Sequence, residues 1–473
     1  MRAKARGTGT IGVTIANQDR VERRGLREIA RGLIARGFGL FSGNSDHSVA
    51  RRGAATAFII RVAGAAVAFL SQIILARWMG RYEFGIYVYV WTWLLLLGSL
   101  VPLGLCTAAQ RFIPEYQTQG DFARLRGYIF ASRWFVVAIA TAVAGVTIAG
   151  LFAFEKHLDH HYVIPLVLMC SCLPMHALSA AQDGISRSYN WIDMALAPGY
   201  IARPLVILAF MAGFHFAGFP NTALYAMAST VIAYWIVTVA QMAMMGRRLK
   251  EKVPAGPRKY ETKFWLATAF PIFMVESFYF LLTYTDILVL EIYVEPDEVA
   301  VYYAATKILA LVAFVYFAVS AATAHRFAEY HVSGQHEKLE RFLTDSIKWT
   351  FWPSLLGTLG LLVIGKLLLS LFGEGFDSGY GLMFVLAIGL LARAGVGPVE
   401  RLLNMVGEQK SCALIYAGAF VVNLSLCFIL IPHLKLYGAA IAISAAMMFE
   451  SAMLFLVTKR KLNLHVFVWK KPA

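Results

Sequence analysis

Long apolar runs dominate the sequence and recur about twelve times, each close to the roughly 20 residues that a helix needs to cross a bilayer. They cover approximately residues 55–76, 84–107, 134–154, 162–183, 195–217, 221–245, 264–288, 300–323, 349–371, 380–398, 411–431 and 436–458. The chain of 473 residues is 59% hydrophobic and 15% charged, whereas about a quarter of a soluble domain is charged. The sequence therefore predicts an all-α polytopic membrane protein with about twelve transmembrane helices.

The 43 Lys and Arg residues are distributed unequally between the two sides that these runs define. Most lie before the first run, in alternate loops and after the last run. The other loops contain only Arg77, Arg81, Lys156 and Lys435. Because Lys and Arg accumulate in cytoplasmic loops, we expect both termini to be cytoplasmic. Topology thus accounts for the net charge of +15, and we expect no nucleic-acid partner.

A charged, proline-containing segment, GRRLKEKVPAGPRKYETK at 246–263, divides the chain near its middle. Similar residues recur in the two halves at one constant spacing, Tyr87 with Tyr302 and Trp134 with Trp349. This repeat indicates two six-helix lobes in parallel orientation around a central cavity. The predicted parts are an N-terminal extension 1–54, an N-lobe 55–245 with spans 1–6, a cytoplasmic linker 246–263, a C-lobe 264–458 with spans 7–12, and a cytoplasmic tail 459–473.

The N-terminal extension is basic, and apolar residues recur every three or four positions over 20–41. That spacing fits an amphipathic helix on the anionic inner leaflet. A disordered basic extension explains the same composition, and the two interpretations stay open.

Two segments resemble a known family of transporters. Residues 75–116, LARWMGRYEFGIYVYVWTWLLLLGSLVPLGLCTAAQRFIPEY, and residues 285–308, TDILVLEIYVEPDEVAVYYAATKI, are similar to the polysaccharide-biosynthesis flippases of the Wzx type. These belong to the multidrug, oligosaccharidyl-lipid and polysaccharide exporter superfamily. The resemblance covers about residues 50 to 460.

This resemblance implies alternating access by two six-helix lobes in the bacterial inner membrane. The implied cargo is a polyprenyl-diphosphate-linked oligosaccharide, moved from the inner to the outer leaflet for O-antigen, capsule or exopolysaccharide assembly. The implied partners are this lipid-linked oligosaccharide, membrane lipids, a coupling ion and the polysaccharide polymerase machinery.

Four cations within the apolar runs are candidates for holding a diphosphate: Arg61, Lys307, Arg203 and Arg393. Hydrocarbon does not accept phosphate charge, so a transport path needs buried cations, and Arg suits multidentate binding of phosphate. Arg61 and Lys307 are the strongest candidates because each lies several residues inside its run. Snorkelling to the headgroups and ion pairing between helices are the alternative interpretations.

Two carboxylates within the runs, Glu276 and Asp286, are candidates for coupling transport to a proton or sodium ion. A carboxylate in a low-dielectric site can bind and release a cation as the site opens and closes. Glu276 is the better candidate, because Asp286 lies at a depth comparable to that of Lys307 and a structural ion pair would account for both.

Two other classes of function stay open. One is an exporter of drugs or small metabolites in the same superfamily, which an apolar and acidic cavity would favour over a cationic one. The other is a membrane-embedded polysaccharide polymerase or glycosyltransferase, which normally needs a sizeable catalytic loop. We therefore expect a transporter without enzymatic activity. We also expect no cofactor and no metal site, since the histidines at 157–161 lie in a loop without a fixed scaffold.

Overall fold

The computed structural model describes residues 46–154, 156, 160–464 and 466–468. The helix predicted over 20–41 and most of the histidine loop lie outside these residues. Phe58–Ala473 forms one compact unit.

The described residues fold into helices, and no strand occurs among them. In chain order the elements are α2 (Asp46–Leu100), α3 (Leu105–Gln119), α4 (Phe122–Ala153), α5 (His160–Ser188), α6 (Ile192–Ala197), η2 (Pro198–Ala202), α7 (Arg203–Phe216), α8 (Ala223–Lys252), α9 (Thr262–Leu290), α10 (Pro296–Ala310), α11 (Ala313–Val332), α12 (His336–Ser370), η3 (Phe376–Gly379), α13 (Tyr380–Val396), α14 (Val399–Met405), α15 (Gln409–Leu434) and α16 (Leu436–Leu462).

Eleven helices in the described part of the chain are long and apolar enough to cross a membrane. The first, Thr56–Gln119, contains a non-helical residue at Gly80, where two helices meet at a kink with φ 75°. Each of the predicted apolar runs overlaps one of these helices, and the Gly80 kink separates the first two runs. The predicted all-α membrane fold is confirmed.

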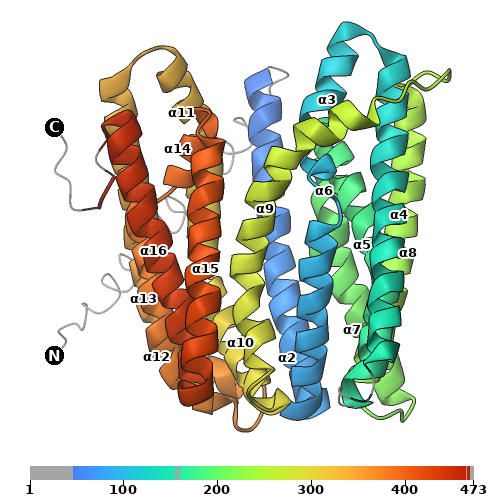
Figure 1. The fold of residues 1–473 in the computed structure, drawn as a ribbon, viewed down its shortest axis with the longest axis vertical. Coiled ribbons are helices and arrows are strands. Elements are labelled where there is room, and N and C mark those ends of the chain that lie inside the picture. Colours follow the sequence, from blue (N-terminus) through green and yellow to red (C-terminus); the bar gives the residue numbers. More distant parts are fainter. Residues whose placement is uncertain (1–45, 155, 157–159, 465, 469–473) are drawn as a thin grey trace, which may run out of the picture. The chain divides into compact units, whose positions relative to one another are not determined.

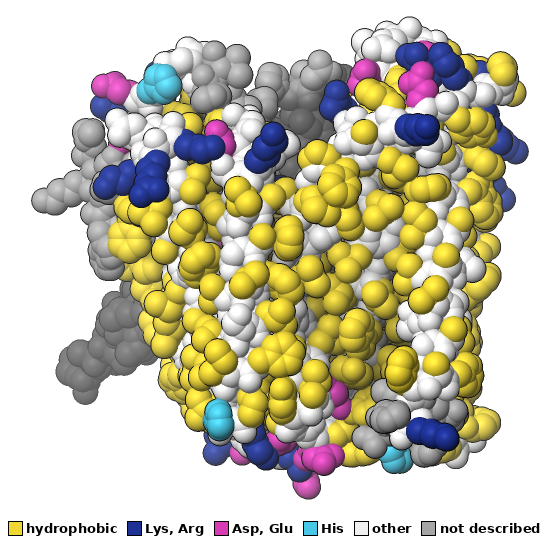
Figure 2. Space-filling view, viewed as in Figure 1, with side chains coloured by type: hydrophobic (Ala, Val, Ile, Leu, Met, Phe, Trp, Pro, Cys, Tyr) yellow, Lys and Arg dark blue, Asp and Glu magenta, His cyan; other side chains and the backbone are white. Residues whose placement is uncertain are grey.

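Apolar side chains cover the middle of the surface in Figure 2, and charged side chains gather at its two ends. Val146 on α4 is 74% exposed and Val363 on α12 is 82% exposed. Exposed aliphatic side chains in such a band are those expected to face lipid.

The helices of each half pack mainly on one another. In the first half, α5 packs against α3, α4 and α8, and in the second half α16 packs against α13 and α15. Equivalent residues of the repeat have equivalent environments, because Tyr87 and Tyr302 are buried and Trp134 and Trp349 are exposed. This agreement supports the duplication, and superposition of the two lobes stays a prediction.

The two membrane sides are named here by the segments that lie on them. The linker side carries residues 246–263, and the opposite side carries residues 291–295 between α9 and α10. On the opposite side α2 of the first half contacts α10 of the second. Gly85 lies against Pro296 so closely that a Cβ on Gly85 would be 1.8 Å from the Pro296 carbonyl oxygen. Gln72 donates a hydrogen bond of 2.9 Å to the Tyr303 hydroxyl, so the lobes are joined at this side.

Helix α9 contacts both halves, and Figure 1 shows it crossing from α3 at one end to α10 at the other. Near its start, Trp265 donates from Nε1 to the Tyr116 hydroxyl on α3 at 2.8 Å. Near its end, Asn423 on α15 donates to the Leu282 carbonyl at 3.4 Å. The linker at 246–263 divides the two halves in sequence. In the structure, however, α9, which follows the linker, packs against helices of both halves.

The linker is attached to the first half by α4. The Arg126 side chain donates to the carbonyls of Pro257 and Pro254 at 2.8 and 2.7 Å. Arg124 forms an ion pair of 2.9 Å with Glu261, directly before α9. These contacts hold the start of α9 against the N-lobe.

Candidate transport site

Two adjoining cavities lie at the inner faces of the second-half helices. The main cavity has a volume of about 590 Å³ and is lined chiefly by α9, α11, α13 and α14, with Thr107 contributed by α3. The deep cavity has a volume of about 250 Å³ and is lined by α9, α10, α13 and α16, with Thr92 and Leu95 contributed by α2. Tyr279, Leu390 and Arg393 line both cavities. Their total volume falls in the range of ordinary ligand sites.

The cavities extend along the membrane normal. Arg401 on α14 and Gln409 at the start of α15 line the main cavity and are solvent-exposed, so they form its rim on the linker side. Asp286 and Lys307 line the deep cavity. Asp286 lies near the opposite-side end of α9, and Lys307 lies in the last turn of α10, farther from that side. The route therefore begins at the linker side and ends close to the joined α2 and α10.

Arg393 lies at the junction of the two cavities. Its Nε is 3.4 Å from a carboxylate oxygen of Glu450 on α16. Its guanidinium carbon lies 5.8 Å from the ring centre of Tyr279 and 5.5 Å from that of Tyr316. Arg393 thus reaches the site in which a substrate anion was expected, and it is paired there with Glu450.

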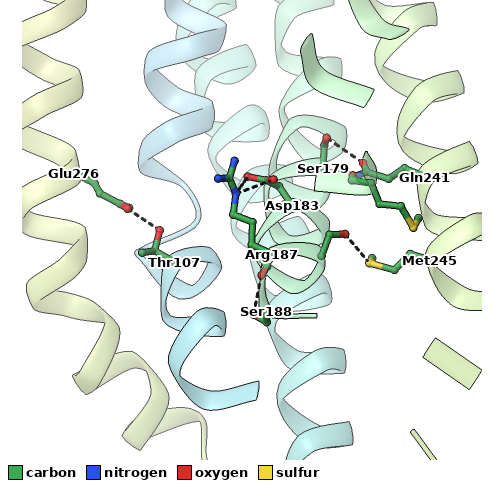
Figure 3. A network of polar contacts seen from close by, with 11 residues as sticks. Thr107, Ser179, Asp183, Arg187, Ser188, Gln241, Met245 and Glu276 are labelled. Carbon is green, nitrogen blue, oxygen red and sulfur yellow. Dashed lines mark hydrogen bonds and ion pairs between the residues drawn. The ribbon is translucent and has the colours of Figure 1, made fainter. Parts of the chain in front are cut away.

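Glu276 faces the main cavity from the middle of α9. The Thr107 hydroxyl on α3 donates a hydrogen bond of 2.7 Å to its Oε1, as Figure 3 shows. This bond crosses from one half of the chain to the other. Pro271 lies five residues earlier and lines the same cavity.

Asp286 and Lys307 both line the deep cavity, but the hydrogen-bond partner of Asp286 is Tyr302. The Tyr302 hydroxyl donates to Asp286 Oδ2 at 2.6 Å. The Lys307 ammonium instead lies 4.7 Å from the ring centre of Tyr303. The direct ion pair considered from sequence is thus replaced by a phenol–carboxylate bond with a lysine nearby.

Arg61 lies between the halves without lining either cavity directly. Its guanidinium lies 6.0 Å from the ring centre of Tyr200 on η2 and 5.5 Å from that of Phe317 on α11. Phe317 itself lines the main cavity. The buried Nε of Arg61 has no hydrogen-bond partner within the described residues. Arg61 is therefore next to the site, and its Nε–H is available to donate a hydrogen bond.

Arg203 belongs to a polar network inside the first half, part of which is drawn in Figure 3. It donates to the Ser179 hydroxyl at 2.8 Å and lies 4.0 Å from the ring centre of Tyr234. Asp183, on the same helix as Ser179, pairs with Arg187 at 2.9 Å. Arg203 lines neither cavity.

Sequence reasoning missed the contribution of α14. Glu400, Arg401 and Asn404 line the main cavity from this helix, and the Tyr316 hydroxyl donates to Glu400 at 3.3 Å. The signal was present as a Gly397-Pro398 break directly before a Glu-Arg pair at the end of a span. A break of this kind allows a short helix to turn back toward the path.

The charges that line the cavities are of both signs. The cations are Arg393, Arg401 and Lys307, and the carboxylates are Glu276, Asp286, Glu400 and Glu450. Since neither sign dominates, cavity charge does not by itself separate a diphosphate cargo from a cationic one.

Comparisons with solved structures support the fold. An inward-facing multidrug resistance MATE family transporter of the MOP superfamily is 14% identical, with TM-score 0.69 over 90% of this chain and 96% of that chain. A MOP superfamily transporter from Pyrococcus furiosus is 14% identical, with TM-score 0.66 over 90% of this chain and 97% of that one. The lipid II flippase MurJ in an inward closed conformation is 15% identical, with TM-score 0.65 over 85% and 87%.

The described helices share the fold of MOP superfamily transporters, and eleven of them are long and apolar enough to cross a membrane. The polysaccharide biosynthesis protein family matches residues 50–331, and the MatE family matches residues 271–429. The chain belongs to the polysaccharide biosynthesis protein family, as the residues quoted from its sequence indicated. No curated protein sequence matches it.

Proposed function

We propose that this transporter moves a polyprenyl-diphosphate-linked oligosaccharide from the inner to the outer leaflet of the bacterial inner membrane. The product would serve O-antigen, capsule or exopolysaccharide assembly, with the polymerase machinery as a downstream partner. The observation that carries the proposal is the family match over residues 50–331, and the MurJ fold similarity is consistent with it.

The chemistry of the main cavity supports a saccharide head group. Tyr279 and Phe280 offer ring faces, and Asn404 and Gln409 offer amide donors and acceptors. Aromatic rings pack on the apolar faces of sugars, and amides bind their hydroxyls. Arg393 and Arg401 offer the guanidinium groups that a diphosphate requires.

The conformation supports alternating access. The main cavity reaches exposed residues on the linker side, and α2 and α10 are in direct contact on the opposite side. The Lys and Arg distribution predicts that the linker side is cytoplasmic. In this arrangement the cargo enters from the cytoplasmic leaflet, and separation of α2 from α10 releases it. The proposed role needs no enzymatic activity and no cofactor.

Export of drugs or small metabolites is the second candidate. The MatE match over residues 271–429 and the four carboxylates in the cavities favour it. A cationic drug would be held by those carboxylates, whereas a diphosphate would be held by the arginines.

A deletion of the gene separates the two candidates. We expect a lipid-linked oligosaccharide to accumulate on the inner leaflet, with surface polysaccharide lost and restored by the wild-type chain. Arg401→Gln should fail to restore it, and Arg187→Gln, which removes an ion pair outside the cavities, serves as the matched control. Unchanged lipid-linked intermediates together with increased sensitivity to cationic drugs would refute the flippase proposal.

A further inference from the structure

The buried carboxylate of Glu450 forms an ion pair with Arg393 but lacks the hydrogen bonds that buried polar groups normally have. The Glu450 side chain is 1% exposed, and neither carboxylate oxygen accepts a hydrogen bond from the described residues. Its contact with Arg393 is 3.4 Å, longer than a good N–H···O bond. A buried carboxylate normally has several donors, so this pair is held by charge alone.

The two partners differ in their access to the cavities. The Arg393 side chain is 22% exposed and lines both cavities, whereas Glu450 is buried behind it on the deep-cavity side. A guanidinium has five donors in a planar fork. Its contact with Glu450 is an ion pair without hydrogen-bond geometry, since both Glu450 oxygens lack a hydrogen-bond partner within the described residues. Its remaining neighbours are ring faces, at Tyr279 and Tyr316.

We infer that Glu450 is an internal counter-ion that occupies the anion-binding position of Arg393 until the phosphate group of a cargo replaces it. This inference rests on the proposed function for its natural ligand. In the empty transporter the carboxylate keeps the guanidinium neutralised at the junction of the cavities. An arriving phosphate offers more acceptor oxygens than the carboxylate contributes, and it approaches from the exposed side of Arg393.

The other charged groups around the junction do not replace Glu450 in this role. Glu400 is held by the hydroxyl of Tyr316, and Asp286 by the hydroxyl of Tyr302. Glu276 is held by Thr107 on the other half of the chain. Of the four carboxylates that line the cavities, Glu450 is the one that forms an ion pair with a cavity cation among the described residues.

The arrangement makes an anion compete with a carboxylate for one arginine. Displacing the carboxylate adds the same free-energy cost to the binding of every anion. A group that binds with two or more oxygens can overcome this cost, whereas one that makes a single contact cannot. It therefore selects phosphate esters and diphosphates over singly contacting anions such as chloride.

The test is equilibrium binding of radiolabelled inorganic pyrophosphate to the purified full chain. Glu450→Gln removes the competing charge and should tighten binding about tenfold, which corresponds to about 1.4 kcal/mol that is no longer needed to displace the carboxylate. Arg393→Gln should weaken binding by at least about tenfold, both alone and combined with Glu450→Gln. Glu450→Asp withdraws the carboxylate by one methylene and should give an intermediate gain, so it serves if Glu450→Gln does not fold.

Asp193→Asn is the matched control. Asp193 pairs with Arg248 at 2.8 Å, and neither residue lines the main cavity or the deep cavity. Its removal should leave pyrophosphate binding unchanged, and each variant is used only if it elutes as one species in gel filtration.

Binding to Glu450→Gln that is equal to or weaker than wild type overturns the counter-ion role, and so does an absence of measurable binding to all variants. The binding measurements and the gene deletion test different claims, the counter-ion role and the cargo. If Glu450→Gln binds pyrophosphate more tightly but deletion accumulates no lipid-linked oligosaccharide, the counter-ion role stands and the proposed cargo is wrong.

Discussion

The contact between Gly85 and Pro296 makes a quantitative prediction about closure on the opposite side. A Cβ at position 85 would be 1.8 Å from the Pro296 carbonyl oxygen, about 1.6 Å short of the 3.4 Å at which ordinary van der Waals contact begins. The blocking atom belongs to the backbone, so no side-chain rotation can relieve the clash. Gly85→Ala must therefore move α2 and α10 apart.

That separation weakens the other contacts of this interface. Phe84 packs edge-to-face on Tyr303 at 6.2 Å and on Phe376 at 6.3 Å. Overpacking of this kind costs about 1–3 kcal/mol. Since 1.4 kcal/mol is a factor of ten, we expect the closed population to fall by about fivefold to a hundredfold relative to states open on the opposite side.

Cysteine labelling measures this shift. Phe84→Cys is placed in a background without the five native cysteines, and its rate of reaction with a membrane-impermeant maleimide reports opening. We expect Gly85→Ala to raise the rate by at least fivefold, the lower end of the population shift estimated above. Gly145→Ala on α4, where a Cβ would meet nothing within 4 Å, should leave the rate unchanged. Equal rates in the Gly85 and Gly145 variants would refute the closure assigned to this contact.

Three further predictions concern topology, phosphate binding and ion coupling. Maleimide added outside intact cells should label Glu295→Cys and miss Lys252→Cys, and the reverse pattern would invert the direction of transport. Arg61→Ala should reduce export by more than about tenfold in inserted protein, while Arg61→Lys retains part of it; normal export by Arg61→Ala would remove Arg61 from the phosphate path. Glu276→Gln should leave cargo binding intact and abolish the dependence of transport on pH or sodium in proteoliposomes, and a preserved dependence would exclude Glu276 as the coupling group.

The number and order of the spans were predictable from sequence for a physical reason. Hydrocarbon offers no hydrogen-bond partners, so a spanning segment must be a helix of about 20 apolar residues. The span predicted at 380–398 is present as α13, which ends at Val396. The positions at which helices end near Gly80 and Gly397 follow from glycine at positive φ, 75° and 66°.

The partners of the buried charges were not predictable in the same way. Sequence gives the depth of a residue along its helix, but it gives the facing direction only where one face is polar. In a membrane the lipid face and the packed face are both apolar, so this signal is lost. For this reason the depths of Asp286 and Lys307 were compatible with an ion pair, whereas the helix orientations place Tyr302 against Asp286. Where helical spacing did place a charge beside its partner, at Asp183 and Arg187, it was one turn away in the same helix.

The packing of α9 restricts how the two halves can separate. Its start is attached to the N-lobe by Trp265 and by the linker, and its end is attached to α15 near Leu282. Movement of one half against the other must therefore be absorbed within α9, between these two attachments. Pro271 lies in that interval and lacks the N–H that would close a helical hydrogen bond, so bending costs less there than at any neighbouring residue. Glu276 follows Pro271 by little more than one helical turn and lies between the same two attachments. Its hydrogen bond with Thr107 connects this part of α9 to α3. A cation or proton that displaces Thr107 from Glu276 would thus act on the one segment of α9 that must change shape for the opposite side to open.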